Sequence, residues 1–311
     1  MPQWLVEGEV EAMRIGLTGG APGVARTVAD AQRAEQEGFT AYALPGDSTA
    51  TLALIGAQTE SIGLLTAVVP IFGIHPSVLA NQARVAQDAT NGRFMLGIGL
   101  SHLSTIEERL GISFERPGSR MDEYLQVLAP LLRGEAVDLD GEFYTYHGEP
   151  RPGAADTVPL GVAALGPRML RMAGEQAQAT ILWMANARAI ESHVAPRIRR
   201  AAESAGQPEP DVIAGLPVAL TDDPADAREQ AAQQFATYGT LPSYRAILDH
   251  GGAAGPGDAA LVGNEAELDA ELDRLEAAGV TLFNPAIFRT EPGGPARTRE
   301  YLADRARSRG G

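Results

Sequence analysis

His102 is the side chain in this sequence that is best placed to transfer a proton. Residues 94–100, directly before it, are apolar on both faces, which predicts a buried parallel strand, and Gly97 and Gly99 remove side chains from that strand. Barrels of parallel strands carry their active sites at the carboxyl ends of the strands. An imidazole has a reference pKa of about 6.5 and exchanges protons near neutrality. We therefore expect His102 to act beside a flat ligand that lies against the two glycines, with a purely structural histidine as the alternative.

A second candidate site follows the predicted strand at residues 160–163. Gly166 lies at the turn after this strand, Pro167 suits the first position of a helix, and Arg168 and Met169 fall in the first helical turn. Free backbone N–H groups at a helix N-terminus, together with a guanidinium, favour phosphate binding without a lysine. A purely structural turn is the alternative interpretation.

Several further polar and aromatic residues lie at or near predicted strand ends or in long connections, where they could contact a ligand. Histidines are more often structural than functional, and aromatic residues are often part of a core, so packing explains any one of them equally well. The residues singled out on this ground are Asp47, Ser48, His75, Trp183, Tyr238 and Tyr244.

The composition excludes several kinds of chemistry. Cysteine is absent, which excludes disulfides, thiolate metal sites and a cysteine nucleophile. All 25 residues counted as Lys or Arg are arginine, which excludes a Schiff-base lysine and a P-loop. No histidines and carboxylates have metal-ligand spacing, so no metal site is expected. The formal net charge of -15 argues against a nucleic-acid surface.

Apolar, strand-like runs alternate with amphipathic, helix-like segments along the chain, which is typical of repeated βα units. Eight strands are predicted, and eight such units that close on themselves form a (β/α)8 barrel, also called a TIM barrel. An open doubly wound sheet is the alternative fold, because periodicity does not reveal closure. The predicted strands are residues 14–17, 41–44, 62–69, 94–100, 160–163, 179–183, 212–220 and 281–288.

Two connections are too long for simple loops and are interpreted as insertions after the fourth and seventh strands. In the first, residues 119–132 form a predicted helix and residues 137–147 a predicted hairpin. The second, residues 235–261, is rich in Gly, Pro and Tyr. Both are candidate lids, because they are expected on or beside the carboxyl-end face.

The two ends of the chain are assigned separately from a barrel of residues 13–290. Residues 1–12 are acidic and lack the features of a signal peptide, which predicts an N-terminal extension and a cytoplasmic protein. No apolar stretch is long enough to cross a bilayer. Residues 291–311 are a basic tail or helix, whose arginines are expected to form a solvated face; contact with an anionic ligand tail is the alternative.

The sequence resembles the bacterial luciferase-like family, in particular its actinobacterial branch that uses the deazaflavin coenzyme F420. The more specific matches are Gly97-Ile98-Gly99-Leu100-Ser101-His102 and the turn Gly166-Pro167-Arg168. The resemblance extends from Met13 to about Phe288. Further matching segments are residues 66–70, 75–76, 91–94, 116–117, 121–125, 131–135, 163–169, 182–184 and 241–245.

This resemblance implies a barrel that binds a flavin-shaped ring at its carboxyl-end face. It also implies a non-proline cis peptide in the third strand, within Thr66-Ala67-Val68, and phosphate contacts in the turn described above. Dimers are common in the family. The cofactor contacts expected from the residues and the resemblance together are Asp47, Ser48, Thr66, Ala67, Val68, Gly97, Gly99, Ser101, His102, Gly166, Pro167, Arg168 and Met169.

One departure from related enzymes bears on the substrate. Sugar-phosphate dehydrogenases of the same superfamily carry a histidine after the second strand and a glutamate after the fourth, where this sequence has Ser48 and His102. The resemblance therefore gives little support to a sugar-phosphate substrate.

The sequence thus predicts an F420-dependent oxidoreductase that transfers a hydride between the deazaflavin and a small organic substrate with an activated C=C, C=N or carbonyl group. His102 would donate or orient the accompanying proton, and His75, Trp183, Tyr238 and Tyr244 would line the substrate pocket. An FMN-dependent luciferase-like monooxygenase and a non-catalytic barrel that binds a cofactor or metabolite are the alternatives. Neither nucleic acid nor a membrane is an expected partner.

Overall fold

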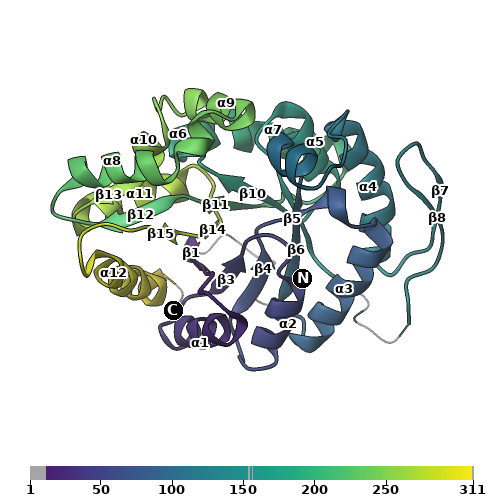
Figure 1. The fold of residues 1–311 in the computed structure, drawn as a ribbon, viewed down its shortest axis with the longest axis horizontal. Coiled ribbons are helices and arrows are strands. Elements are labelled where there is room, and N and C mark those ends of the chain that lie inside the picture. The colour runs from purple at the N-terminus through teal and green to yellow at the C-terminus, as the bar shows by residue number, and fades with distance from the viewer. Residues whose placement is uncertain (1–11, 153–154, 156, 310–311) are drawn as a thin grey trace.

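Parallel strands alternate with helices around a barrel in the computed structural model, which describes residues 12–152, 155 and 157–309 (Figure 1). Ten short strands form the barrel sheet, in the order β1-β14-β11-β10-β9-β6-β4-β3-β2, with β5 also paired to β6. The strands of this sheet are β1 (Arg14–Ile15), β2 (Leu17–Thr18), β3 (Ala41–Leu44), β4 (Gly63–Thr66), β5 (Val69–Pro70), β6 (Phe94–Gly99), β9 (Leu160–Ala163), β10 (Ala179–Trp183), β11 (Asp211–Gly215) and β14 (Leu282–Phe283).

The ring closes through the first strand, which is divided into β1 and β2 at Gly16. On one side β1 pairs with β14, and the amide of Gly16 donates to the carbonyl of Phe283 at 2.8 Å. On the other side β2 pairs with β3. The two ends of the strand order are therefore consecutive segments of one strand, and the predicted barrel is confirmed.

Helices surround the barrel and connect its strands. The last helix contacts β1 and β12, and Figure 1 shows it beside α1. The α-helices are α1 (Val24–Gln36), α2 (Thr49–Gly56), α3 (Pro76–Ala89), α4 (Pro117–Leu132), α5 (Pro167–Gln176), α6 (Ala187–Ala189), α7 (Ala195–Ala205), α8 (Pro224–Gln234), α9 (Pro242–His250), α10 (Pro256–Ala259), α11 (Glu265–Ala277) and α12 (Gly294–Arg309); short 3-10 segments are η1 (Ile71–Gly73) and η4 (Ala236–Gly239), and π-helical turns are η2 (Ser104–Arg109) and η3 (Ile190–Val194).

Besides the first strand, three further predicted strands are each split in two. The third is interrupted by a cis peptide between Ala67 and Val68, at the place that the family resemblance implied. In the eighth, Pro285 lacks a backbone N–H and separates β14 from β15 (Ala286–Ile287). The seventh breaks between β11 and β12 (Pro217–Leu220). The outer halves of the last two strands leave the barrel sheet and form a small sheet beside it, in which β12 pairs with β15 on one side and with β13 (Leu261–Gly263) on the other.

The two insertions differ in character. The predicted hairpin is present as β7 (Val137–Asp140) and β8 (Thr145–Gly148), and it packs on α4 at the outer side of the helix layer (Figure 1). The connection after the seventh strand, by contrast, is largely helical, with η4, α9 and α10 in place of an irregular loop.

Small and branched apolar side chains fill the barrel interior. Gly97 is required there by packing, because a Cβ at this position would lie 2.0 Å from the carbonyl oxygen of Thr66. The other interior residues are Ala41, Ala43, Leu65, Met95, Ala179, Ile181, Ile213 and Leu282.

The predicted basic segment at the C-terminus is helix α12, and its arginines are paired with acidic groups. Arg299 is 14% exposed and lies between Asp30 at 2.6 Å and Glu37 at 2.6 Å, both on or beside α1. This differs from the expected solvated face, because α12 packs against the barrel and brings its cations to carboxylates of neighbouring helices.

The predicted extension at residues 1–12 lies outside the described residues except for Ala12. Among the helices described, none is long and apolar enough to cross a membrane.

Candidate functional site

His102 lies just after β6, at the carboxyl end of the barrel, as predicted. Ser101 before it adopts a left-handed backbone with φ of 62°, which turns the chain at the end of the strand. The imidazole is half-buried and meets the edges of two tyrosine rings, with centroid distances of 5.7 Å to Tyr244 and 6.2 Å to Tyr238. Burial lowers the pKa of His102 below its usual 6.5, so the ring is mostly neutral at pH 7.

The tyrosines belong to a cluster that we call the aromatic group, consisting of His102, Trp183, Phe235, Tyr238 and Tyr244. Tyr238 lies 4.8 Å from Tyr244 and 5.8 Å from Trp183, and Trp183 lies 5.8 Å from Phe235, all with inclined rings. Burial raises the pKa of Tyr238 and of Tyr244, so both phenols stay neutral. Near neutral pH the group is therefore largely uncharged. The aromatic group connects the end of β10 with η4 and α9. Phe235 is its one member that the sequence analysis did not single out.

Small residues meet at the carboxyl end of the barrel strands. A Cβ at Gly99 would lie 2.6 Å from Cγ2 of Val68 and 3.1 Å from Cβ of Ala163. Val68 follows the cis peptide, and both Val68 and Ala163 are partly exposed. The absence of large side chains at this point leaves backbone and methyl groups as the surface that a flat ligand would meet.

Oδ1 of Asn284, directly after β14, is buried and lacks a partner among the described residues. Nε1 of Trp183, at the end of β10, is also buried, and its hydrogen bond with Tyr238 lowers the pKa of that phenol against the effect of burial. Buried donors and acceptors are nearly always paired, because leaving one unpaired costs about 1–3 kcal/mol. A hydrogen-bond donor on a bound molecule would satisfy the oxygen of Asn284. Asn284 was not predicted, because it falls inside the strand expected at residues 281–288 and the break of that strand after Phe283 is seen only in the structure.

The turn predicted to bind phosphate, which we call the anion site, lies at an uncapped helix N-terminus beside an arginine, and its role stays a prediction. Gly166 precedes α5, whose N-terminus has no side-chain cap, and a Cβ at Gly166 would meet nothing within 4 Å. Nη2 of Arg168 donates to Oγ of Ser119 at 3.2 Å, so the guanidinium reaches the first turn of α4. The N-termini of α4 and α5, each with partial positive charge, thus lie near one exposed arginine. Gly118 and Ser119, in the first turn of α4, lie beside Arg168 and were not predicted.

Thr66 and Gly97 lie below the mouth of the barrel. Oγ1 of Thr66 donates to the carbonyl of Gly97 at 2.8 Å and accepts from its amide at 2.8 Å. Regular pairing of β4 with β6 stops at Leu65 and Met95, so this side chain continues the ladder beyond the last paired residues. Both residues are buried, and direct cofactor contact by them stays a prediction, as it does for Ala67 beside them.

The remaining predicted residues occupy other positions. Asp47 is exposed and Ser48 is the residue before α2, with its hydroxyl donating to the carbonyl of Leu44 at 3.3 Å. His75 precedes α3, where its Nδ1 accepts from the amide of Ser77 at 3.3 Å. The structure does not bring His75 into the aromatic group, and its role in a substrate pocket stays a prediction.

His75 instead contacts the hairpin. Its ring lies 5.7 Å from that of Tyr144 and 6.3 Å from that of Tyr146. The backbone amide of Phe143 in the hairpin donates to Glu123 of α4 at 2.7 Å. This insertion therefore flanks the site on the outside of α4, and the aromatic residues of the second insertion are the ones that meet His102.

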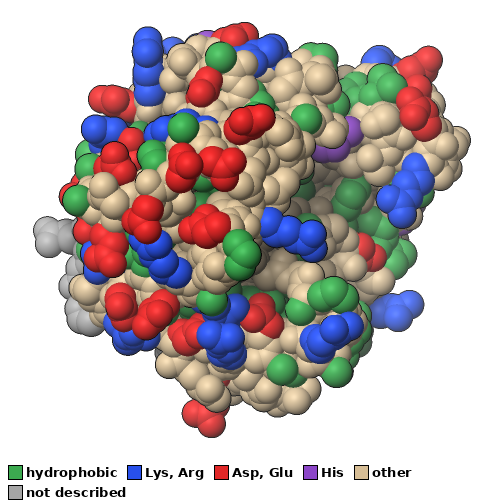
Figure 2. Space-filling view, turned by 60° about the vertical axis from the view of Figure 1, so that its left-hand side comes forward, with side chains coloured by type: hydrophobic (Ala, Val, Ile, Leu, Met, Phe, Trp, Pro, Cys, Tyr) green, Lys and Arg blue, Asp and Glu red, His purple; other side chains and the backbone are tan. Residues whose placement is uncertain are grey.

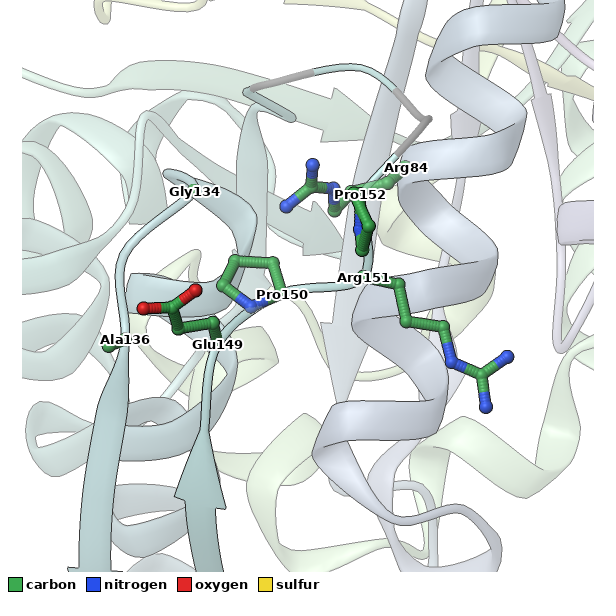
Figure 3. A pocket seen from close by; sticks show the side chains of 7 residues that line it. All are labelled: Arg84, Gly134, Ala136, Glu149, Pro150, Arg151 and Pro152. Atoms are coloured by element: carbon green, nitrogen blue, oxygen red, sulfur yellow. The ribbon is translucent and has the colours of Figure 1, made fainter.

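The surface has other hollows. A pocket of about 290 Å³ lies beyond the C-terminal end of α4, where Arg84, Glu149 and Pro150 are among its lining residues (Figure 3). It is remote from α4's first turn and is therefore separate from the anion site. Figure 2 shows a face on which acidic and arginine side chains are interspersed and which is hollowed beside a histidine.

The described residues contain no group of three or more His, Cys, Asp or Glu arranged to hold a metal.

Comparison with known proteins gives a family match over most of the chain. The model of the family described as luciferase-like monooxygenase matches residues 10–307. A 5,10-methylenetetrahydromethanopterin reductase from Methanolobus tindarius is 26% identical over 268 residues, which is 80% of this chain and 81% of that protein. A reductase of the same name from Archaeoglobus fulgidus is 32% identical over 124 residues, 40% of this chain and 37% of that protein.

Two further proteins are similar to this chain. An F420-dependent glucose-6-phosphate dehydrogenase from Nakamurella multipartita is 29% identical over 202 residues, 61% of this chain and 57% of that protein. The solved structure of an F420-dependent secondary alcohol dehydrogenase in complex with an F420-acetone adduct superposes with a TM-score of 0.78 at 17% identity and covers 93% of this chain and 98% of that one. At this identity the superposition supports the fold alone.

Proposed function

The chain belongs to the luciferase-like monooxygenase family, and on this basis we propose that it is a coenzyme F420-dependent oxidoreductase that transfers a hydride between the deazaflavin and a small organic substrate. The names of the relatives support this choice of cofactor and reaction class. The observation that carries the proposal is the position of His102 beside the aromatic group, at the carboxyl end of a barrel whose next βα turn forms an anion site.

The residues present fit a deazaflavin. Gly99, Val68 and Ala163 would face its ring, and Gly166 to Met169, with Ser119, would hold its phosphate. Asn284 Oδ1 offers an acceptor that has no partner among the described residues. When bound, the deazaflavin supplies the hydride chemistry.

His102 would move the proton that accompanies the hydride. Its neutral ring can accept a proton from a hydroxyl in the oxidation direction, and its protonated ring can give one to the substrate in the reduction direction. The rings around it exclude water and hold the substrate. Because the aromatic group is largely uncharged near neutrality, we assign the substrate to neutral, partly apolar molecules with a C=C, C=N or carbonyl group, or the corresponding reduced form, in preference to sugar phosphates.

Fluorescence titration of the purified protein with F420 and, separately, with FMN tests the cofactor. We expect saturable F420 binding, followed by oxidation of reduced F420 when a neutral acceptor such as a cyclic enone is added. FMN reduction with oxygen uptake would instead identify a flavin monooxygenase. Binding of F420 or FMN without turnover of any acceptor tested would indicate a non-catalytic barrel that binds a cofactor.

A further inference from the structure

We propose that His193 is a positioning residue that holds the turn of the anion site and connects it, through His250, to the helix that covers His102. The part of this proposal that concerns cofactor affinity rests on the proposed function. The part that concerns the turn and the helix rests on the chain alone.

The first contact of His193 is with the loop that leads into the anion site. His193 lies in η3, is 4% exposed, and its Nε2 donates to the carbonyl of Leu165 at 2.9 Å. Leu165 directly precedes Gly166, the residue before α5. The backbone amide of Ala164 makes only a long bond, 3.4 Å, to the carbonyl of Ile181. The hydrogen bond from His193 therefore fixes the orientation of the peptide that begins the anion-binding turn.

The second contact of His193 is with the C-terminal end of α9. The rings of His193 and His250 stack with centroids 3.8 Å apart and planes 23° apart. Beside them, Nδ2 of Asn186 donates to the carbonyl of Gly251 at 3.1 Å, while its Oδ1 accepts from the amide of Ala189 at 3.0 Å. The end of α9 is thus attached to the segment that contains His193.

These contacts also bear on the same helix nearer its N-terminus, where Tyr244 meets His102. A rigid helix that is held at His250 also holds Tyr244, which lies less than two turns earlier. Nδ1 of His193 is buried and has no partner in the described chain, so its ring proton stays on Nε2, where the carbonyl of Leu165 accepts it. One imidazole therefore links the anion-binding turn with the wall of the substrate site.

The hydrogen bond is tested by two variants that differ in donor capacity. His193→Phe keeps a ring for stacking but leaves the carbonyl of Leu165 unpaired, whereas His193→Gln retains an N–H donor. The amides of Ala164 and Leu170 flank the turn and donate to the carbonyls of Ile181 and Gly166. Their hydrogen exchange, measured without cofactor, should quicken about tenfold in His193→Phe and return most of the way in His193→Gln. Unchanged exchange in His193→Phe, or equal exchange in both variants, would overturn the assignment.

The same variants test the link to the cofactor. The Kd for F420 should rise about tenfold in His193→Phe and much less in His193→Gln, while the KM of the organic substrate changes less than the Kd. If the wild-type protein does not bind F420, the proposed function fails, but the exchange measurement still decides the role of His193. If F420 binds equally well to all three proteins, the positioning role in cofactor binding is wrong and the proposed function stands.

The stack is tested at the exposed partner. His250→Ala leaves the hydrogen bond of His193 in place, and we expect exchange across residues 242–250 to quicken about threefold and the KM of the organic substrate to rise, with the Kd for F420 within twofold of wild type. His147→Ala, which removes an exposed histidine of the hairpin, is the matched control and should change neither. If His250→Ala behaves like the control, α9 is not held by the stack and this half of the proposal is wrong.

Discussion

Arg168 on α5 donates a hydrogen bond of 3.2 Å to Ser119 on α4, so that two helix N-termini share one guanidinium although the two residues are 49 positions apart in the chain. Backbone N–H groups at both termini and the charge of the arginine favour an anion at the same place. This contact supports the proposal that the turn binds an anion and is not merely structural.

Replacement of Arg168 by glutamine should weaken F420 binding about tenfold, because it removes a charge-assisted hydrogen bond to phosphate. Turnover at saturating F420 should change little, since the anion site is separate from His102. Fluorescence titration gives the Kd and steady-state kinetics give kcat. Arg171→Gln, one turn later on the same helix and paired with Glu175, is the control and should bind F420 like the wild type.

His102→Ala should lower kcat by about 100-fold, because positioned acid–base groups contribute about 10² to 10⁴ in rate. The Kd for F420 should stay within about threefold of wild type, since the phosphate contacts are remote from the imidazole. If His102→Ala converts substrate at the wild-type rate, His102 does not transfer the proton.

The lowered pKa of His102 predicts opposite pH profiles for the two reaction directions. In substrate reduction the protonated ring gives a proton, so kcat/KM should fall as pH rises through a midpoint below 6.5. In substrate oxidation the neutral ring accepts a proton, so kcat/KM should rise through the same midpoint. Measurement of both directions from pH 4.5 to 8 checks the sign, and a midpoint above 6.5 would contradict the effect of burial.

Thr66→Val should destabilise the fold by about 2 kcal/mol, because it leaves the buried amide and carbonyl of Gly97 without their partner. Thr66→Ser keeps the hydroxyl and should cost less than half as much. Urea unfolding followed by circular dichroism gives both free energies of unfolding. A Thr66→Val variant as stable as the wild type would show that the two hydrogen bonds of the hydroxyl do not contribute to stability.

Arg299→Ala should cost about 2 kcal/mol of unfolding free energy, because it leaves the carboxylates of Asp30 and Glu37 together at a mostly buried contact. Arg297→Ala breaks only the exposed pair with Asp222 and should cost less than about 1 kcal/mol. Urea unfolding at low and high salt distinguishes the two, since only the exposed pair should respond strongly to screening.

The sequence predicts the barrel and the place of His102 because both depend on local patterns. Alternating strands and helices reveal the βα units, and an apolar run with a polar end reveals the working face of β6. Tyr238 and Tyr244 were selected for the same reason, as aromatic residues in a long connection. Their contact with His102 depends on the path of η4 and α9, which composition alone did not reveal.

Other features had no local signal. The break of the third strand depends on a cis peptide, and the family resemblance, not the apolar pattern of residues 62–69, indicated it. Ser119 reaches Arg168 only because α4 and α5 are neighbours in the folded barrel. His75, the residue before Pro76, caps the helix and contacts the hairpin, which its local sequence did not indicate, and its role in a substrate pocket stays a prediction.

The closure of the barrel at β1 sets an order of events during synthesis. Arg14 and Thr281 are hydrogen-bonded although they are 267 positions apart, so one edge of the first strand has no partner until nearly the whole chain has left the ribosome. Contacts of such separation form late in folding, and an unpaired strand edge can associate with other chains in the meantime. A nascent chain stalled before residue 281 would thus expose its first strand, and chaperone binding should persist until β14 and α12 emerge.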